Sequence, residues 1–277
     1  MTKVLVNEEN LTNIANAIRG KNGGTTTYKP GDMALAISNI PSMTTPKIGF
    51  VPTAWKTSGN NQQIGLITEG IWYGNLTQAA FATNPPDYVY NGPFGYLQNV
   101  IFADEITTIA NYAFYQCRSL ALTSLPNSII SIRSYAFYNC AALALTSLPE
   151  NLKSISDYGF EGCSSLAITK LPNQITEISW SAFSKCTSLV ELTCEGNIAT
   201  IEANAFSSCS ALAKIVFPNI TSVPVLDATN AFSGTPMVAG TGYFYVPDEL
   251  VDSFKSATNW SSYADQIKGI SELEVNA

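Results

Sequence analysis

Residues 129–149 read IISIRSYAFYNCAALALTSLP, and most apolar positions of this stretch recur along the chain every 23 residues. An Ala-Phe or Gly-Phe pair, a cysteine three places later and a leucine three places after the cysteine return together. The phenylalanines and cysteines of these ladders are Phe114, Phe137, Phe160, Phe183, Phe206, Cys117, Cys140, Cys163, Cys186 and Cys209. A fixed period of this length predicts a solenoid, in which each coil packs only against its neighbours.

Each coil is expected to contain three segments. Residues 120–126 predict a short strand that ends at proline. Ile129 and Ile132 are spaced to point inward from a second extended or turn segment. Residues 134–140 predict a helical or 3₁₀ turn that leads back to the next leucine. At a strand spacing of ~4.8 Å, about six such coils would stack into a rod of roughly 30 Å.

The ladders resemble the BspA-type leucine-rich repeat, whose pattern runs roughly I-x-x-I-x-x-x-A-F-x-x-C-x-x-L-x-x-[IL]-x-[IL]-P. The resemblance extends over about residues 90–247. It implies an α+β repeat solenoid, a leucine-rich-repeat rod of about six 23-residue coils with irregular caps. Departures lie toward the ends: Phe94 stands at a cysteine position, Cys194 replaces a leucine, and the Phe232 coil carries a three-residue insertion.

Four regions are expected along the chain. Residues 1–40 form an N-terminal helical attachment or oligomerisation module, and residues 41–96 form a linker with an N-terminal capping region. Residues 97–240 form the leucine-rich-repeat solenoid, and residues 241–277 form a C-terminal cap. Within the C-terminal cap, residues 242–247 predict a last strand. Asp248 is expected to cap a helix over residues 249–256, and residues 263–267 suggest another helix.

The N-terminal module is predicted to be a short pair of helices. Their apolar faces comprise Leu11, Ile14, Ile18, Met33, Ile37 and Ile40. Two such helices cannot bury enough surface to stand alone, so we expect them to dock on the solenoid, on copies of themselves or on another protein. Residues 11–21 and 28–37 resemble a module of bacteriophage virion proteins that precedes variable display domains. This resemblance implies attachment to other virion proteins and a homo-oligomer, with a trimer favoured.

Composition excludes several classes of function. Only 13% of residues are charged and the net charge is -7, which argues against binding to nucleic acid or to an anionic membrane surface. Histidine is absent, so His-based catalytic groups and the usual zinc sites are excluded. The sequence contains neither a signal-peptide pattern nor an apolar stretch long enough to cross a bilayer, so we expect no membrane insertion and synthesis in the cytoplasm without ordinary export.

The remaining chemical groups favour structure over catalysis. Five of the six cysteines lie on one ladder and the sixth replaces a buried leucine, so buried structural thiols are expected. The adjacent carboxylates Asp104 and Glu105 would point to opposite faces of an extended segment. We therefore expect no enzyme activity, no catalytic residues, and no cofactor or metal.

Aromatic residues give the strongest binding signal. Tyrosines precede three of the Ala/Gly-Phe pairs and follow two of them, and a tryptophan extends the first series; the set comprises Tyr112, Tyr115, Tyr135, Tyr138, Tyr158 and Trp180. Because the neighbouring phenylalanines point inward, some of these rings should lie on the flank of the rod. Tyrosine suits the recognition of sugar or protein, but it can also simply pack against the next coil. Both interpretations remain open from the sequence.

These features favour a non-enzymatic bacteriophage virion structural protein that displays the solenoid for host attachment, as a tail or head fibre. Its expected partners are other virion proteins and a host surface glycan or protein, and its expected location is the virion. One alternative is a bacterial cell-surface adhesin of BspA type, and another is a capsid decoration protein without a receptor role. Host binding by the virion protein would gain strength from several copies acting together.

Overall fold

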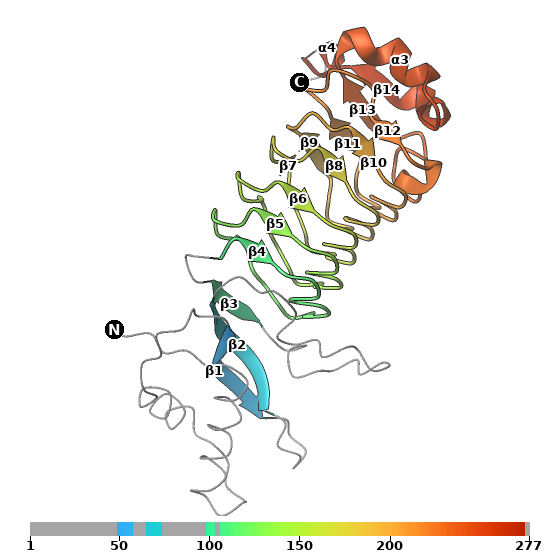
Figure 1. The fold of residues 1–277 in the computed structure, drawn as a ribbon. Coiled ribbons are helices and arrows are strands. Elements are labelled where there is room, and N and C mark those ends of the chain that lie inside the picture. Colours follow the sequence, from blue (N-terminus) through green and yellow to red (C-terminus); the bar gives the residue numbers. More distant parts are fainter. Residues whose placement is uncertain (1–48, 58–64, 74–97, 103–105, 275–277) are drawn as a thin grey trace, which may run out of the picture.

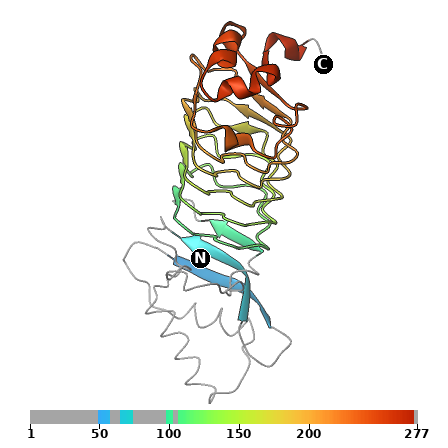
Figure 2. The ribbon, with the colours of Figure 1, turned by 90° about the vertical axis from the view of Figure 1, so that its right-hand side faces the viewer.

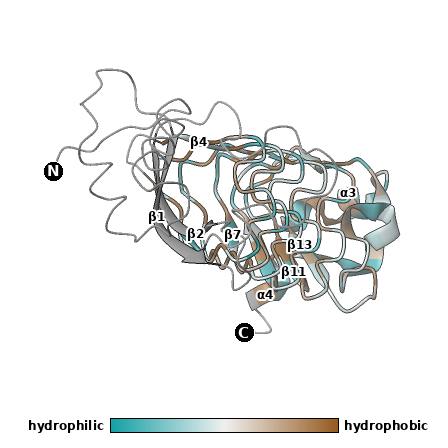
Figure 3. Cartoon of the chain, turned by 90° about the horizontal axis from the view of Figure 1, so that it is seen from below, coloured by the Kyte–Doolittle hydropathy of each residue, from teal (hydrophilic) through white to brown (hydrophobic). Residues whose placement is uncertain are grey.

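The computed structural model describes residues 49–57, 65–73, 98–102 and 106–274. The repeats stack as successive coils along one axis and form a rod (Figure 1 and Figure 2). Hydrophobic and hydrophilic residues alternate along the coils, as a view from below makes visible (Figure 3). The helical pair predicted within residues 1–40, with its six apolar residues, lies outside the described residues.

One side of each coil carries a two-residue parallel strand. The strands are β4 (Thr108–Ile109), β5 (Ser131–Ile132), β6 (Ser154–Ile155), β8 (Glu177–Ile178), β10 (Thr200–Ile201) and β12 (Val225–Leu226). β4, β5 and β6 form one sheet, and β8, β10 and β12 form another. Each strand turns its second residue inward; Ile109 pairs with Ile132, and Ile132 with Ile155. The predicted inward isoleucine ladder is therefore confirmed.

A second series of strands follows the leucine corner of the coils. It comprises β7 (Lys170–Leu171), β9 (Glu191–Cys194), β11 (Lys214–Val216), β13 (Tyr243–Val246) and β14 (Ile267–Gly269), in one parallel sheet. A further sheet lies toward the N-terminus (Figure 1): β3 (Asn99–Phe102) pairs in parallel with β2 (Gly65–Tyr73), which pairs antiparallel with β1 (Gly49–Thr57).

Between β3 and β7 this second series is interrupted. The strand predicted at residues 120–126 is not formed, and this segment bends at Thr123. The equivalent residues 143–149 also form no strand and bend at Thr146. Leu122 and Leu125 are both buried although they lie three places apart. Since only residues two apart share a face of a strand, the chain bends at Thr123 to turn both leucines inward.

In later coils, the apolar residue that corresponds to Leu122 lies three places after the ladder leucine, where Leu122 lies two places after Leu120. Leu192 and Cys194 lie two apart in β9, both are buried, and the strand is regular. Proline contributes to the difference between coils. Glu195 N–H donates to the Leu171 carbonyl across β9 and β7 (3.1 Å), whereas the equivalent position one coil earlier is Pro172, which has no N–H.

The segment before each cysteine also differs from its prediction. Residues 134–140 form successive turns, without a helical or 3₁₀ segment. Phe137 N–H donates to the Gly159 carbonyl of the next coil (2.9 Å), whereas the amides on either side of it donate back within the same turn. This alternation requires two residues with positive φ, here Tyr135 (58°) and Asn139 (56°).

The core is built from the predicted phenylalanine and cysteine ladders. Consecutive phenylalanine rings from Phe114 to Phe232 stack with centroids between 5.1 and 5.7 Å apart. All six cysteine side chains are free and buried. Within the ladder, Cys163 Sγ donates to the Phe137 carbonyl of the preceding coil (3.0 Å). Cys140, Cys186 and Cys209 make the equivalent bond.

Short helices close the C-terminal end of the rod. They are η1 (Thr229–Phe232), η2 (Asp248–Leu250), α3 (Val251–Ser256), η3 (Trp260–Gln266) and α4 (Ser271–Glu274). The predicted strand over residues 242–247 is β13, but it is not the last strand, because β14 pairs beside it.

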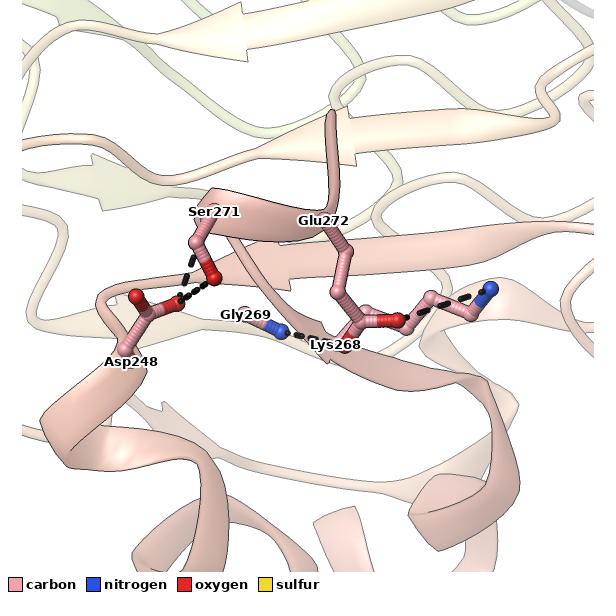
Figure 4. Close-up of polar contacts among 5 residues, drawn as sticks. All are labelled: Asp248, Lys268, Gly269, Ser271 and Glu272. Carbon is pink, nitrogen blue, oxygen red and sulfur yellow. Dashed lines mark hydrogen bonds and ion pairs between the residues drawn. The ribbon is translucent and has the colours of Figure 1, made fainter. Parts of the chain in front are cut away.

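Asp248 does not cap the helix that follows it, contrary to the prediction. Its carboxylate Oδ1 accepts hydrogen bonds from the N–H (3.2 Å) and the hydroxyl (3.1 Å) of Ser271 (Figure 4). Gly269 permits this approach, because a Cβ there would overlap the Asp248 carboxylate. On the other side of the same turn, Glu272 accepts a hydrogen bond from Gly269 N–H (3.1 Å). Asp248 therefore ties the start of the cap to its last helix.

Candidate functional site

The six aromatic residues singled out from the sequence form one connected cluster, which we call the tyrosine cluster (Tyr112, Tyr115, Tyr135, Tyr138, Tyr158 and Trp180). Tyr135 stacks between Tyr112 (centroids 4.8 Å apart, 4° between planes) and Tyr158 (4.4 Å, 10°). In a second column, Tyr115 stacks on Tyr138 (5.0 Å, 7°). The columns touch each other edge to face, as between Tyr112 and Tyr115 (5.6 Å, 60°). Consecutive coils thus share one connected set of aromatic rings.

The two columns end at different coils. In the second column, Glu161 takes the place of a tyrosine, lies almost fully buried and forms an ion pair with Lys185 (2.6 Å). The first column continues to Trp180, whose ring lies 6.2 Å from Tyr158 and is 48% exposed. Glu202 supports this end by accepting a hydrogen bond from the backbone N–H of Trp180 (2.7 Å). Neither carboxylate is recognisable from the sequence, because each role depends on a contact with another coil.

Backbone strain accompanies the first column. Tyr112, Tyr135 and Tyr158 all have positive φ, near 58°. The equivalent residues of the next two coils are Ser181 and Asn204, also at positive φ. Bulky residues rarely adopt this region, whereas asparagine adopts it readily. The folded rod therefore retains three tyrosines at positions where their backbone is unfavourable.

The ring faces within the columns cover one another, which limits what the cluster can offer to a ligand. All five tyrosines are partly exposed, and Trp180 is 48% exposed. The cluster therefore offers partly exposed tyrosines and one half-exposed tryptophan. Burial and the neighbouring tyrosines raise the pKa of Tyr135 from 10.0 to about 12, so this phenol stays a protonated hydrogen-bond donor at neutral pH.

The other chemical groups of the rod are arranged for structure. Burial raises the pKa of the Cys117 and Cys209 thiols to about 12, and that of the other four cysteines is raised as well. Such thiols are poor nucleophiles at neutral pH. Among the described residues, no group of three or more His, Cys, Asp or Glu side chains is placed to hold a metal ion. None of the helices within that part of the chain has the length and apolar character of a membrane span.

The geometry defines a leucine-rich-repeat solenoid: coils of about 23 residues with inward leucine, isoleucine and phenylalanine ladders and parallel strands. Residues 86–213 match the family model for the BspA type leucine rich repeat region, in six copies. No curated protein matches the chain.

Solved structures of three leucine-rich-repeat proteins are similar to parts of the chain. One from T. pallidum has 22% identity and a TM-score of 0.41, covering 58% of this chain and 78% of its own. One from Bacteroides ovatus has 21% identity and a TM-score of 0.32, covering 64% and 61%. A leucine rich cell surface protein from Faecalibacterium prausnitzii has 22% identity and a TM-score of 0.34, covering 55% of each chain.

Proposed function

We propose that the protein is a non-enzymatic binding protein whose solenoid displays the tyrosine cluster to a glycan or protein on a cell surface. The observation that carries this proposal is the positive φ of Tyr112, Tyr135 and Tyr158. Strained backbone tends to occur where function requires a particular side chain. Tyrosine and tryptophan are also the residues that most often dominate binding surfaces.

The favoured setting of this binding protein is a bacteriophage particle. Support comes from the resemblance of residues 11–21 and 28–37 to a virion module. There, the N-terminal residues would attach to other virion proteins and assemble several copies, a trimer being favoured. Weak contacts of each rod would then add up through multivalency. The rod would serve as a tail or head fibre and reach the host surface.

A bacterial cell-surface adhesin is the second candidate. It is supported by the match of residues 86–213 to the BspA-type repeat and by the cell-surface description of the F. prausnitzii protein. Both settings use the same binding surface, so one experiment on the rod addresses the proposal in either case.

The experiment compares binding of labelled full-length protein to whole bacteria and to glycan and protein arrays. In the test variant, Tyr112→Asn, Tyr135→Asn and Tyr158→Asn are combined, since asparagine stands naturally at this position in Asn204. A matched control combines Val190→Asn and Val225→Asn, two exposed apolar residues outside the cluster.

We expect the tyrosine variant to bind about tenfold more weakly or worse, because aromatic anchors dominate such interfaces. The valine control should bind like the wild type. Equal binding by all three proteins, with circular dichroism spectra unchanged, would remove the tyrosine cluster from the proposed function.

A further inference from the structure

The interrupted second series of strands leaves a polar groove between two coils. This groove, of about 330 Å³, lies where the bent residues 146–148 meet the regular strand β7. It is lined by Thr146, Ser147, Leu148, Glu150, Thr169, Lys170, Leu171, Pro172, Asn173 and Glu195. None of these residues belongs to the tyrosine cluster, so the groove is a separate feature of the rod.

The backbone hydrogen bonds that would close this groove are not made. On its far side, β7 uses the Thr169 carbonyl to accept from Thr193 N–H (2.8 Å). Alternate residues of a strand face opposite neighbours, so Lys170 N–H and C=O face residues 146–148. No backbone hydrogen bond joins those residues to β7 within the described part of the chain. A ligand that carries both a donor and an acceptor can bond to these groups in place of solvent.

A peptide group is the natural complement of these groups, but a peptide strand does not fit. The two coils remain bonded beside the groove, where Ala167 N–H donates to the Leu145 carbonyl (3.0 Å). On the other side of the rod, the same two coils are joined by the hydrogen bond that Ser156 N–H donates to the Ile132 carbonyl (2.9 Å). The opening is therefore local, and it admits a compact group that carries one amide.

The walls of the groove indicate what surrounds that amide. Leu148, Leu171 and Pro172 are buried and provide an apolar floor. Exposed hydroxyl, amide and carboxylate groups form the rim, on Thr146, Ser147, Thr169, Asn173 and Glu150. Lys170 pairs with Glu195 at the edge (3.1 Å), so the ammonium there is already neutralised. An apolar floor ringed by hydroxyl, amide and carboxylate groups suits a polyhydroxylated ligand that carries no charge of its own.

We infer that this groove binds a single N-acetylated amino-sugar residue. The acetamido group forms hydrogen bonds with the backbone groups of Thr146 and Lys170 that no other backbone group pairs. Its methyl group packs against the floor of Leu148, Leu171 and Pro172. The sugar hydroxyls meet the threonine, serine, asparagine and glutamate side chains of the rim. This site is additional to the tyrosine cluster and gives a glycan a second point of contact on the rod.

The test is a titration of ¹⁵N-labelled full-length protein with N-acetylglucosamine, followed by NMR. Parallel titrations use N-acetylgalactosamine, glucose and a glycan polymer that ends in N-acetylglucosamine. We expect the amide signals of Leu148 and Lys170 to move, and glucose to bind about tenfold more weakly because it lacks the amide. A response to the polymer alone would place recognition in a longer glycan and overturn the assignment of a single-residue site.

A register-repair variant provides the sharpest control. Leu145→Glu with Thr146→Leu copies the spacing of Glu191 and Leu192, where β9 is regular, and should close the groove. The same exchange one coil earlier, Leu122→Glu with Thr123→Leu, changes no residue of the groove. The first variant should lose binding at least tenfold and the second should retain it.

A milder variant guards against misfolding of the register-repair protein. Thr146→Val with Ser147→Ala removes two hydroxyl groups and keeps the coil spacing. We expect binding to weaken about tenfold, with the NMR spectrum otherwise preserved. The inference is overturned if no amino sugar moves the Leu148 and Lys170 signals, or if both register-repair variants bind as the wild type does. Neither result would contradict the proposal for the tyrosine cluster, which is tested with its own variants.

Discussion

The indole Nε1–H of Trp260 donates to the carbonyl of Pro224 across the end of the solenoid (2.8 Å). The equivalent carbonyl of the preceding coil, that of Ala199, accepts from Val225 N–H (2.9 Å). A side chain thus replaces the backbone amide that a further coil would supply. Asn259 does the same for the Leu226 carbonyl, two residues further along, to which its Nδ2 donates (2.7 Å). The cap ends the parallel ladder without leaving unpaired acceptors at these two positions.

Trp260→Phe should lower the free energy of unfolding by about 1–3 kcal/mol, because it leaves the Pro224 carbonyl buried without a donor. For a chain of this size the melting temperature should fall by about 2–4 °C for each kcal/mol. Trp180→Phe is the matched control, since that indole is half exposed and none of the described contacts involves its Nε1. Equal melting temperatures of the two variants would contradict the role given to the Trp260 N–H.

The thiol hydrogen bonds should add measurably to stability beyond packing. Cys163→Ala removes both a buried side chain and the bond to Phe137, and should lower the free energy of unfolding by about 1–3 kcal/mol. Cys194→Ala removes a buried thiol for which no hydrogen bond is made among the described residues. Urea unfolding should show the smaller loss for Cys194→Ala. The reverse order would mean that packing alone explains the cysteine ladder.

Alkaline pH should destabilise the rod steeply. Burial raises the pKa of Cys117 from 9.0 to about 12 in the folded state, so the unfolded chain loses this proton first as pH rises. Stability is then complete below about pH 9 and falls toward pH 12, by up to about 1.4 kcal/mol per pH unit for each such thiol. Urea unfolding at a series of alkaline pH values measures this slope.

Cys117→Ala should reduce that slope at alkaline pH, whatever it does to stability at neutral pH. An unchanged slope would show that the Cys117 thiol does not titrate differently in the two states. Tyr135 adds to the slope from a higher pH, because its pKa rises from 10.0 to about 12 on folding whereas that of Cys117 rises from 9.0.

Tyr135→Asn and Tyr138→Asn should differ in stability although both remove a stacked ring. Tyr135 has positive φ, so asparagine relieves strain there and offsets the lost stacking to within about 1 kcal/mol. Tyr138 has no positive φ, and its replacement should cost about 1 kcal/mol more. Thermal unfolding of the two variants checks this. Equal losses would mean that the positive φ of Tyr135 stores no strain.

The repeat ladders of the fold could be predicted because every one of them is visible in the spacing of single residues. Ile132, Phe137 and Cys140 recur at one interval, and all three are buried as expected. The bend in the second series of strands was partly present in the spacing. Leu122 follows Leu120 by two places whereas Leu192 follows Leu189 by three, although the coil of β7, in which Ile168 follows Leu166 by two places, still forms two strand residues. The prediction missed it because it treated both spacings as the same strand.

Other features depend on contacts that local sequence does not encode. Trp260 lies 36 residues from Pro224, and Asp248 lies 23 residues from Ser271, so neither partner is recognisable from its neighbours along the chain. The tyrosine cluster was predicted as a set of residues, but its positive φ values arise from hydrogen bonding between coils. Its role in binding stays a prediction.

The side chains of Trp260 and Asn259 also limit how one rod can meet another. A stack of parallel strands is a template on which a second molecule can continue the same ladder, and unlimited filaments grow in this way. At the C-terminal end, two of the carbonyls that would nucleate such growth are already occupied within the chain. The edge of β12 is thereby protected against polymerisation, even when many copies are crowded together.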